Sequence, residues 1–532
     1  MSTPQTMICM CSNTGLNSRY EHTLYFNSPS AQSSYFNGKK VKTYTKYAYT
    51  RRSWSLKVEA SMSDACKWDY MFFRNFTDGK VYYYFINNVE YENEGAVTLT
   101  FELDVMQTYL FDWKLHPCFI ERQHTKTDGI GENTVEESID TGELTIASSK
   151  DITELNDLGL LFMSTIYPPS AITGEEVNVY GSNINGIFSG VGIYAVDYTE
   201  VAIMDSFLRR LDKNGLTDSI IGMWCYPKAL VKLKDTDWTE NRSFVEVKNS
   251  TPLSKSYTRP DTFKGYTPKN NKLYTYPYNF LYVSNNSGAA ATYRYERFIN
   301  KSVASFELSG VYSPDGVVRM TPLGYDGVAE DELNYDKGLS LGGFPVCAWN
   351  SDTYKIWLAQ SQASQAQTMG MGALSFVGGI AGMVVSGFTG NPGGVLASGG
   401  VAFSGYNQIS GVLNARKDRE VMPNEMRGAH SPSVNVVNKK QTFTVMNKQV
   451  TPEYARIIDD YFTMYGYAIR KVDKPDIAAR PRFTYIKTIG CHVTGGFCVE
   501  DVNKIESIFN NGITFWKDTN PDTIFDYSID NK

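Results

Sequence analysis

The feature that most constrains the fold of this chain is a long stretch without any charged residue. Positions 356–415, between Lys355 and Arg416, contain no Asp, Glu, Lys or Arg, although charged residues make up 20% of the sequence. The most apolar part, MGMGALSFVGGIAGMVVSGF at 369–388, has twelve apolar residues, six Gly and two Ser. Exposing such an apolar segment to water is unfavourable in free energy. The chain must therefore bury the segment within protein or place it in lipid.

The stretch has the outline of a hairpin. As a helix, 369–388 would rise about 30 Å, roughly one bilayer core. Gly378 and Gly382 have the G-x-x-x-G spacing that lets membrane helices approach closely. A turn at Asn391-Pro392-Gly393-Gly394 then leads into a second, weakly apolar arm at 393–412.

Three ordinary interpretations of this hairpin fit poorly. The thirteen Gly of 369–412 would make a packed helix in water unfavourable by about 10 kcal/mol, which argues against a buried core helix. A resident membrane span should have charged anchors, whereas the preceding border, 359–367, is polar and neutral. A flexible linker would not need Phe376 or Ile380. The pattern favours a segment that is sheltered in one state and exposed to a membrane in another.

The sequence therefore predicts a membrane-active loop whose turn is Asn391, Pro392, Gly393 and Gly394. Its polar borders are 359–367 and Lys417 to Arg419. The apolar contact with lipid is expected from Met369, Met371, Leu374, Phe376, Val377, Ile380, Met383, Val384, Val385, Phe388, Val395, Leu396, Val401 and Phe403.

Composition predicts a large, mainly β protein. Aromatic residues reach 14%, with 36 Tyr, and these favour strands. The formal net charge of -6 provides no basic surface for holding DNA or an anionic membrane. The eight Cys are mostly scattered, which indicates reduced thiols, and the N-terminus shows no secretory signal. We expect a protein made in a cytoplasm that does not bind DNA specifically.

Residues 97–105, VTLTFELDV, alternate with a period of two and predict a strand with one buried face. The preceding VYYYFINNVEY supplies an antiparallel partner across a short turn at Asn93, Glu94 and Gly95. On the expected buried face lie Val97, Leu99, Phe101, Leu103 and Val105, and on the wet face Thr98, Thr100, Glu102 and Asp104.

The C-terminal hundred residues are expected to form a compact α+β unit. EYARIIDDYFTMYGY, at 453–467, predicts a helix that ends at Gly466. Strands are expected at 434–445 and 482–493, and VNKIESIFNNGITFW predicts a second helix followed by a strand. The apolar stripe of the first helix is expected to contain Tyr454, Ile457, Ile458, Tyr461, Phe462 and Tyr465.

No motif predicts catalysis or metal binding. GLSLG at 338–342 fits the G-x-S-x-G string of hydrolases around Ser340, but the required strand before it and helix after it are missing. Cys491, His492 and Cys498 are too few for a structural zinc site, and a strand would turn Cys491 and His492 to opposite faces. We expect no cofactor, no metal and no enzymatic activity.

Several stretches, in one order, resemble a known family, the distal tail knob proteins of small short-tailed phages (Picovirinae podoviruses). They are SAQSSYFNGKK at 30–40, EYENEGAVTLTFELDVMQTYLFDW at 90–113, CFIERQH at 118–124 and YPY at 276–278. After the neutral stretch come DYFTMYGYAIRKVDKPDIAARPRFTYIKTIGC at 460–491 and SIFNNGITFW at 507–516. The resemblance covers the two ends strongly, about 250 residues, and the middle weakly.

The resemblance implies a homohexameric tube that closes the distal end of a virion tail. β-rich, tail-tube-like domains would come from both chain ends, with an inserted knob domain and a long apolar loop. In that family the loops plug the tube and then leave it to open the host cytoplasmic membrane. Implied partners are further copies of this chain, the lower collar or tail tube protein, the host membrane, and phage DNA passing through the lumen without specific binding.

The expected domains follow from both lines of reasoning. They are an N-terminal β-rich tube domain at 1–150, an inserted knob domain at 151–350, the Gly-rich membrane-active loop at 351–430 and a C-terminal α+β tube domain at 431–532. Two alternative functions stay open at this point: a tail-tip cell-wall hydrolase and a free pore-forming protein.

Overall fold

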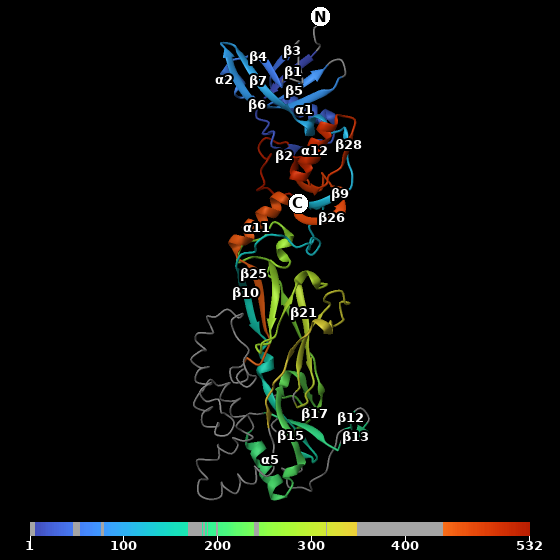
Figure 1. The fold of residues 1–532 in the computed structure, drawn as a ribbon. Coiled ribbons are helices and arrows are strands. Elements are labelled where there is room, and N and C mark those ends of the chain that lie inside the picture. Colours follow the sequence, from blue (N-terminus) through green and yellow to red (C-terminus); the bar gives the residue numbers. More distant parts are fainter. Residues whose placement is uncertain are drawn as a thin grey trace. The chain divides into compact units, whose positions relative to one another are not determined.

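A computed structural model describes residues 6–45, 54–75, 79–168, 183–184, 187–188, 190–197, 201–238, 244–314, 316–347 and 440–532. The described chain is mainly β, with several sheets and a few helices (Figure 1). It divides into two compact units. Unit 1 contains residues 1–142, 265–273 and 452–532, and unit 2 contains 143–264 and 274–451. The four sequence ranges expected as domains stay a prediction.

Unit 1 begins with a six-stranded sheet in the order β3-β1-β5-β6-β7-β4. Its short helices α1, α2 and α3 are Pro29–Lys39, Met62–Ala65 and Val105–Thr108. The strands are β1 Thr6–Cys11, β3 Lys40–Thr45, β4 Ser55–Glu59, β5 Tyr70–Asn75, β6 Val81–Asn93 and β7 Ala96–Leu103.

The expected hairpin is confirmed as β6 and β7. Val97, Leu99, Phe101 and Leu103 are all at most 4% exposed, and the residues between them are half-buried. Gly95 has φ +89 in the connecting turn, a conformation that glycine adopts without strain. The alternation was expected to continue to Val105, which is wrong. β7 ends at Leu103 because the side chain of Asp104 caps α3, and Asp104 itself is buried.

The second sheet of unit 1 has the order β2-β29-β27-β9-β26 and combines strands from both chain ends. β2 (His22–Leu24) runs parallel to β29 (Ile513–Trp516); all other strand pairs in the described ranges are antiparallel. In Figure 1 the blue β2 accordingly lies beside the red C-terminal segment. The remaining strands are β9 Cys118–Gln123, β26 Tyr467–Asp473 and β27 Phe483–Ile489, and β8 Trp113–Leu115 pairs separately with β28 Val493–Gly495.

Helices α11 (Pro452–Tyr465) and α12 (Val499–Asn511) both contact β27. α11 ends as expected at Gly466, which has φ +63. Part of its expected apolar stripe is not buried, because Tyr454 and Ile457 are 40% and 65% exposed. Its buried residues are Ala455, Ile458, Asp459 and Phe462. The expected strand at 482–493 stops at Ile489, since Gly490 adopts φ +65.

Unit 2 is built from short strands and has its own hydrophobic core. One sheet, β10-β25-β19-β20, contains Leu144–Asp151, Thr444–Val450, Asn279–Ser284 and Ala290–Tyr293. A second, β16-β17-β14-β11-β15-β24, contains Val231–Leu233, Val245–Ser250, Gly192–Val196, Leu158–Ser164, Ile220–Pro227 and Val346–Cys347. A third, β18-β21-β22-β23, contains Leu253–Thr258, Val303–Gly310, Val318–Leu323 and Leu339–Leu341. The smaller elements are the hairpin β12 Asn183–Ile184 and β13 Ile187–Phe188, and the helix α5 Val201–Lys213.

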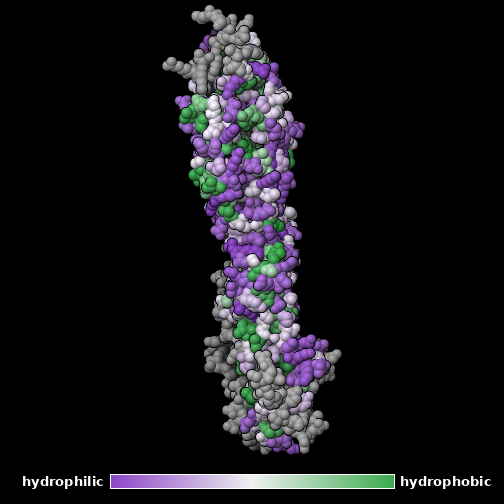
Figure 2. All heavy atoms as spheres, turned by 90° about the vertical axis from the view of Figure 1, so that its right-hand side faces the viewer, coloured by the Kyte–Doolittle hydropathy of each residue, from purple (hydrophilic) through white to green (hydrophobic). Residues whose placement is uncertain are grey.

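None of the helices in the described ranges is long and apolar enough to cross a bilayer. On the face drawn in Figure 2, hydrophobic residues of the described part lie in small groups among hydrophilic ones. Ser340, the centre of the G-x-S-x-G string, lies within β23 and pairs with Arg319 of β22. The string therefore does not form the strand-to-helix elbow that a hydrolase requires.

Candidate functional site

The residues expected to act on a membrane all lie outside the described residues. This holds for the apolar residues of 369–403 and for the turn at Asn391, Pro392, Gly393 and Gly394. Their assignment stays a prediction. The described residues that bear on function are those that shape unit 1, and they form a curled sheet, a buried polar clamp and a small polar hollow.

The six-stranded sheet of unit 1 curls so that its two outer strands approach each other. On β3 the ammonium of Lys42 donates to the carbonyl oxygen of Glu59 on β4 at 2.9 Å. The hydroxyl of Tyr44 donates to the same oxygen at 2.7 Å. The gap between β3 and β4 is thus bridged by these side chains, and we call this gap the seam of the sheet. Curling of this kind follows from the natural twist of strands and prepares a sheet for a tubular wall.

A buried carboxyl group closes one end of this sheet. Asp104 Oδ2 accepts a hydrogen bond from the hydroxyl of Tyr70 at 2.7 Å, and Oδ1 accepts from the backbone N–H of Gln107 at 3.1 Å. Burial raises the pKa of Asp104 to about 6 despite these hydrogen bonds. The charge of this group therefore changes near neutral pH.

A second buried carboxylate clamps residues 265–273 onto α11. Asp459 is fully buried and accepts from the hydroxyl of Tyr266 and the N–H of Lys269, both at 2.6 Å. It also accepts from the backbone and side-chain N–H groups of Asn270, at 2.9 and 2.8 Å. These hydrogen bonds explain how unit 1 retains a short stretch of chain whose neighbours on both sides belong to unit 2.

An ion cluster fixes the same region from the other side. The carboxylate of Glu137 pairs with both Lys272 and Arg122, and the side chains of Glu137 and Lys272 are 1% and 3% exposed. Arg122 also donates to the carbonyl of Gly466 at 2.6 Å, next to the end of α11. Burial lowers the pKa of Lys272, and Glu137 opposes that shift. Removing Glu137 would leave two buried cations without a carboxylate, which is strongly unfavourable.

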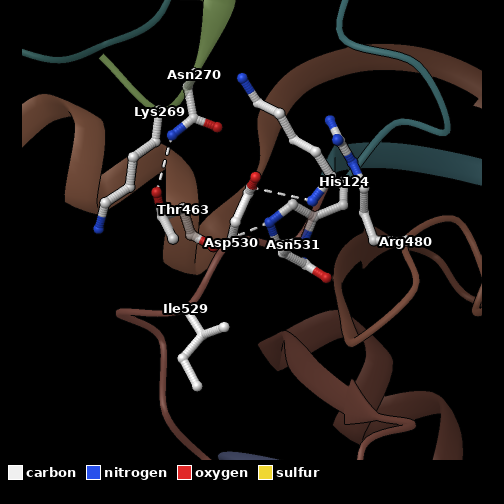
Figure 3. A pocket seen from close by; sticks show the side chains of 9 residues that line it. His124, Lys269, Asn270, Thr463, Arg480, Ile529, Asp530 and Asn531 are labelled. Atoms are coloured by element: carbon white, nitrogen blue, oxygen red, sulfur yellow. Dashed lines mark hydrogen bonds between the residues drawn. The ribbon is translucent and has the colours of Figure 1, made fainter. Parts of the chain in front are cut away.

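A small polar hollow lies beside the clamp, and Figure 3 shows its lining. His124 is fully satisfied there, because its Nδ1 accepts from the N–H of Tyr485 at 2.8 Å. Its Nε2 must then carry the proton that it donates to the carbonyl of Thr463 at 3.0 Å. Burial first, and then the charge of Arg480, lower the pKa of His124 to about 3. The imidazole is therefore neutral at pH 7, and both of its nitrogens have hydrogen-bond partners.

Sequence patterns did not identify these groups. Asp459 and Glu137 are acidic residues in a chain with 57 carboxylates, so nothing in their spacing distinguishes them from exposed acids. The suggested Cys491, His492 and Cys498 set is not one site: Cys491 is buried, with burial raising its thiol pKa to about 12, and it contacts Cys118. His492 faces the exposed side, and its imidazole lies 3.5 Å from Glu506.

Comparison with known proteins identifies relatives along the whole chain. The family model described as "Tail knob protein gp9, C-terminal domain", of Bacillus phage phi29, matches residues 242–532. The model described as "Caudoviral major tail protein N-terminus" matches residues 4–114, the region of the curled sheet. The chain is thus similar to tail knob proteins at one end and to tail tubes at the other.

Individual relatives extend over nearly the full length. The tail knob protein gp9 of Bacillus phage B103 is 25% identical, over 99% of this chain and 98% of that protein. The gp9 of Bacillus phage phi29 is 23% identical, over 96% of each. The solved tail knob protein gp12 of bacteriophage C1 superposes with a TM-score of 0.66 at 14% identity, over 98% of each chain, which shows a shared fold.

Proposed function

Because this chain belongs to the family of the phi29 tail knob protein gp9, we propose that it forms a homohexameric tube at the distal end of a virion tail and that its apolar loop opens the host membrane. The family is one of structural virion tail proteins. Family membership does not by itself establish that the apolar loop enters the membrane or that the tube has six subunits. Each of these two proposals therefore needs its own support.

The observation that carries the membrane role is the neutral stretch itself. Residues 369–412 contain no charge that would have to be desolvated in a bilayer, and their first arm is long enough to cross its core. Their Gly content disfavours a fixed helix in water but suits a loop that is packed inside a tube and later rearranged. Lipid would then induce helix by forcing the backbone to form internal hydrogen bonds.

Two features of unit 1 support a tube. The curled sheet lies in the region similar to caudoviral major tail proteins, and side chains of β3 bridge its two outer strands. An apolar row also crosses three strands, since Phe119 on β9 pairs with both Val472 on β26 and Ile489 on β27. Val472 and Ile489 are 71% and 56% exposed. Neighbouring subunits would cover this row, as exposed apolar rows usually mark contact surfaces.

The lumen of the tube is proposed to be neutral or weakly acidic. A conduit lined with Lys and Arg would retain phosphates and slow the passage of DNA. The net charge of -6 is consistent with weak, non-specific contact during genome ejection. The lower collar or tail tube protein would hold the opposite end of the tube within the virion.

The decisive test is deletion of 369–412 from the purified protein. The deletion variant should form the same hexamer, measured by light scattering, but should no longer release dye from liposomes. Val384→Asp with Val385→Asp should also abolish release, because two charges would enter the bilayer core. Val311→Asp is a matched control, since Val311 is 65% exposed and lies outside the loop. Full dye release by the deletion variant would refute the membrane role.

The two alternatives predict different results. A cell-wall hydrolase should clear a suspension of purified cell walls, and a free pore-forming protein should be absent from purified virions. Mass spectrometry of virions and a turbidity assay with the purified protein therefore separate the three functions.

A further inference from the structure

The polar hollow of unit 1 brings together five parts of the chain (Figure 3). They are His124, residues 269–270, Thr463 of α11, Arg480 in the loop between β26 and β27, and the segment 529–532. It is open on one side and has a volume of about 20 Å³ for water-sized groups, enough for about one of them. All its lining residues belong to the same unit, so the hollow does not depend on how the two units are placed.

The neutral polar side chains around the hollow already have partners. Asn270 donates to the hydroxyl of Thr463 at 2.8 Å, and that hydroxyl donates to the carbonyl of Asp459 at 2.9 Å. Asn531 accepts from the N–H groups of Arg482 and Phe483 and donates to the carbonyl of Phe483. These side chains form the wall of the hollow, so the cationic side chains are the groups that can bind a ligand there.

Arg480 lacks a counter-charge. The residue is only 6% exposed, its Nε is buried without a hydrogen-bond acceptor, and no carboxylate lies within ion-pair distance among the residues that the structure describes. Its backbone is well held, since its N–H donates to Thr484 and its carbonyl accepts from Lys517. A buried donor without an acceptor is unfavourable, so an additional partner is expected beside Nε.

Two further cations flank the same hollow. The ammonium of Lys269 reaches Asp460 only at 3.8 Å, and that of Lys532 reaches Asp128 only at 3.9 Å. His124 is neutral and adds no charge. The one carboxylate in the lining, Asp530, is exposed and accepts from the N–H of Lys532 at 3.2 Å. Of the three cations at the hollow, Arg480 is thus the one without a carboxylate within ion-pair distance among the described residues.

We propose that this hollow is an oxyanion site that binds a single phosphate group, with Arg480 as its buried anchor and Lys269 and Lys532 at its rim. One phosphate oxygen fits inside beside the guanidinium, and the rest of the group stays at the open side. Three cations from three chain segments match a phosphate dianion better than a carboxylate. A bound phosphate would brace the C-terminal segment against Arg480 and residues 269–270.

Isothermal titration of the full-length protein with inorganic phosphate, at constant ionic strength, tests the site. Arg480→Gln should weaken phosphate binding by about tenfold or more, the loss of a charge-assisted hydrogen bond. Lys474→Gln is the matched control, because it removes one positive charge from an exposed position in the same loop without touching the hollow. Glycerol 3-phosphate distinguishes a terminal phosphate on a larger molecule from the free ion, and acetate reports on carboxylates.

The proposal requires that the wild type and Lys474→Gln bind phosphate and that Arg480→Gln binds it at least about tenfold more weakly. Equal affinity in Arg480→Gln, tighter binding of acetate than of phosphate, or no binding by the wild type would each overturn it. If Arg480→Gln fails to fold by circular dichroism, Lys269→Gln with Lys532→Gln replaces it, since the two lysine side chains are 41% and 40% exposed. That double variant should also bind phosphate about tenfold more weakly.

Discussion

Replacing Asp104 with Asn should change how the stability of unit 1 depends on pH. The carboxyl group is 1% exposed, and burial raises its pKa from an ordinary 3.8 to about 6. A raised pKa means that the folded state binds the proton more tightly than the unfolded state does. The contribution of Asp104 to stability is therefore complete below about pH 4 and is lost as the pH rises through about 6.

The size of this effect follows from the difference between the two pKa values. A rise from 3.8 to about 6 corresponds to about 3 kcal/mol of stability lost between pH 4 and pH 7. Asn does not titrate but can keep both contacts of the native group. Its oxygen can accept from the N–H of Gln107, and its amide can donate to the hydroxyl oxygen of Tyr70. The Asp104→Asn variant should lack this loss.

The measurement is hydrogen exchange of the amides of β6 and β7, at 81–103, followed by mass spectrometry from pH 4.5 to 8. All other titrating groups contribute equally to wild type and Asp104→Asn. Their contributions therefore cancel in the difference between the two opening free energies. It should shift by about 2 kcal/mol in favour of the variant between pH 4.5 and 8, because about 1 kcal/mol of the total is already lost below pH 4.5. Asp64→Asn is the control, since Asp64 is exposed and its hydrogen bond from Ser61 lowers its pKa from 3.8. Its contribution therefore changes below the measured pH range, and its difference from wild type should stay nearly constant from pH 4.5 to 8. A difference that does not vary with pH for Asp104→Asn would refute the assigned cause.

Three further variants test the packing of unit 1. Phe101→Asp and Leu99→Asp should each prevent folding or assembly, at a cost of several kcal/mol, because both put a charge on the buried face of β7; size-exclusion chromatography would detect it. Asp459→Ala should leave three donor groups without their acceptor and destabilise unit 1 by roughly 3 kcal/mol or more, seen as faster hydrogen exchange at 265–273. Gly466→Ala should lower the Tm, since its Cβ would lie 2.4 Å from the backbone carbon of Gln123 and its φ is +63.

Local structure in this protein follows from local sequence. The period of two in 97–103 predicted β7 and its buried face, and Gly466 and Gly512 marked the ends of α11 and α12. Such patterns act over a few residues, through side-chain direction and backbone freedom, so a sequence reveals them directly. The charge-free stretch can likewise be read directly from the sequence, because its composition alone predicts a preference for an apolar environment.

The exact ends of elements were less predictable. β7 stops at Leu103 because Asp104 turns inward to cap α3, although alternation alone would continue the strand. On α11 the buried side includes Asp459, while Ile457 is exposed. Hydrophobic periodicity predicts which side of a helix or strand is suited to burial. The elements that pack against it decide which side is actually buried.

Only the tertiary structure decided which distant residues meet. β2 pairs with β29 across nearly the whole chain, and Glu137 reaches Lys272 and Arg122 from separate segments. Arg480 is buried and lines a hollow with residues from four other parts of the chain. A charged side chain is buried only where partners or a ligand arrive from elsewhere in the fold, so no local pattern announces it. The charge-free stretch is visible in the sequence and its membrane role stays a prediction, whereas the clamp and the proposed oxyanion hollow form only once distant segments have come together.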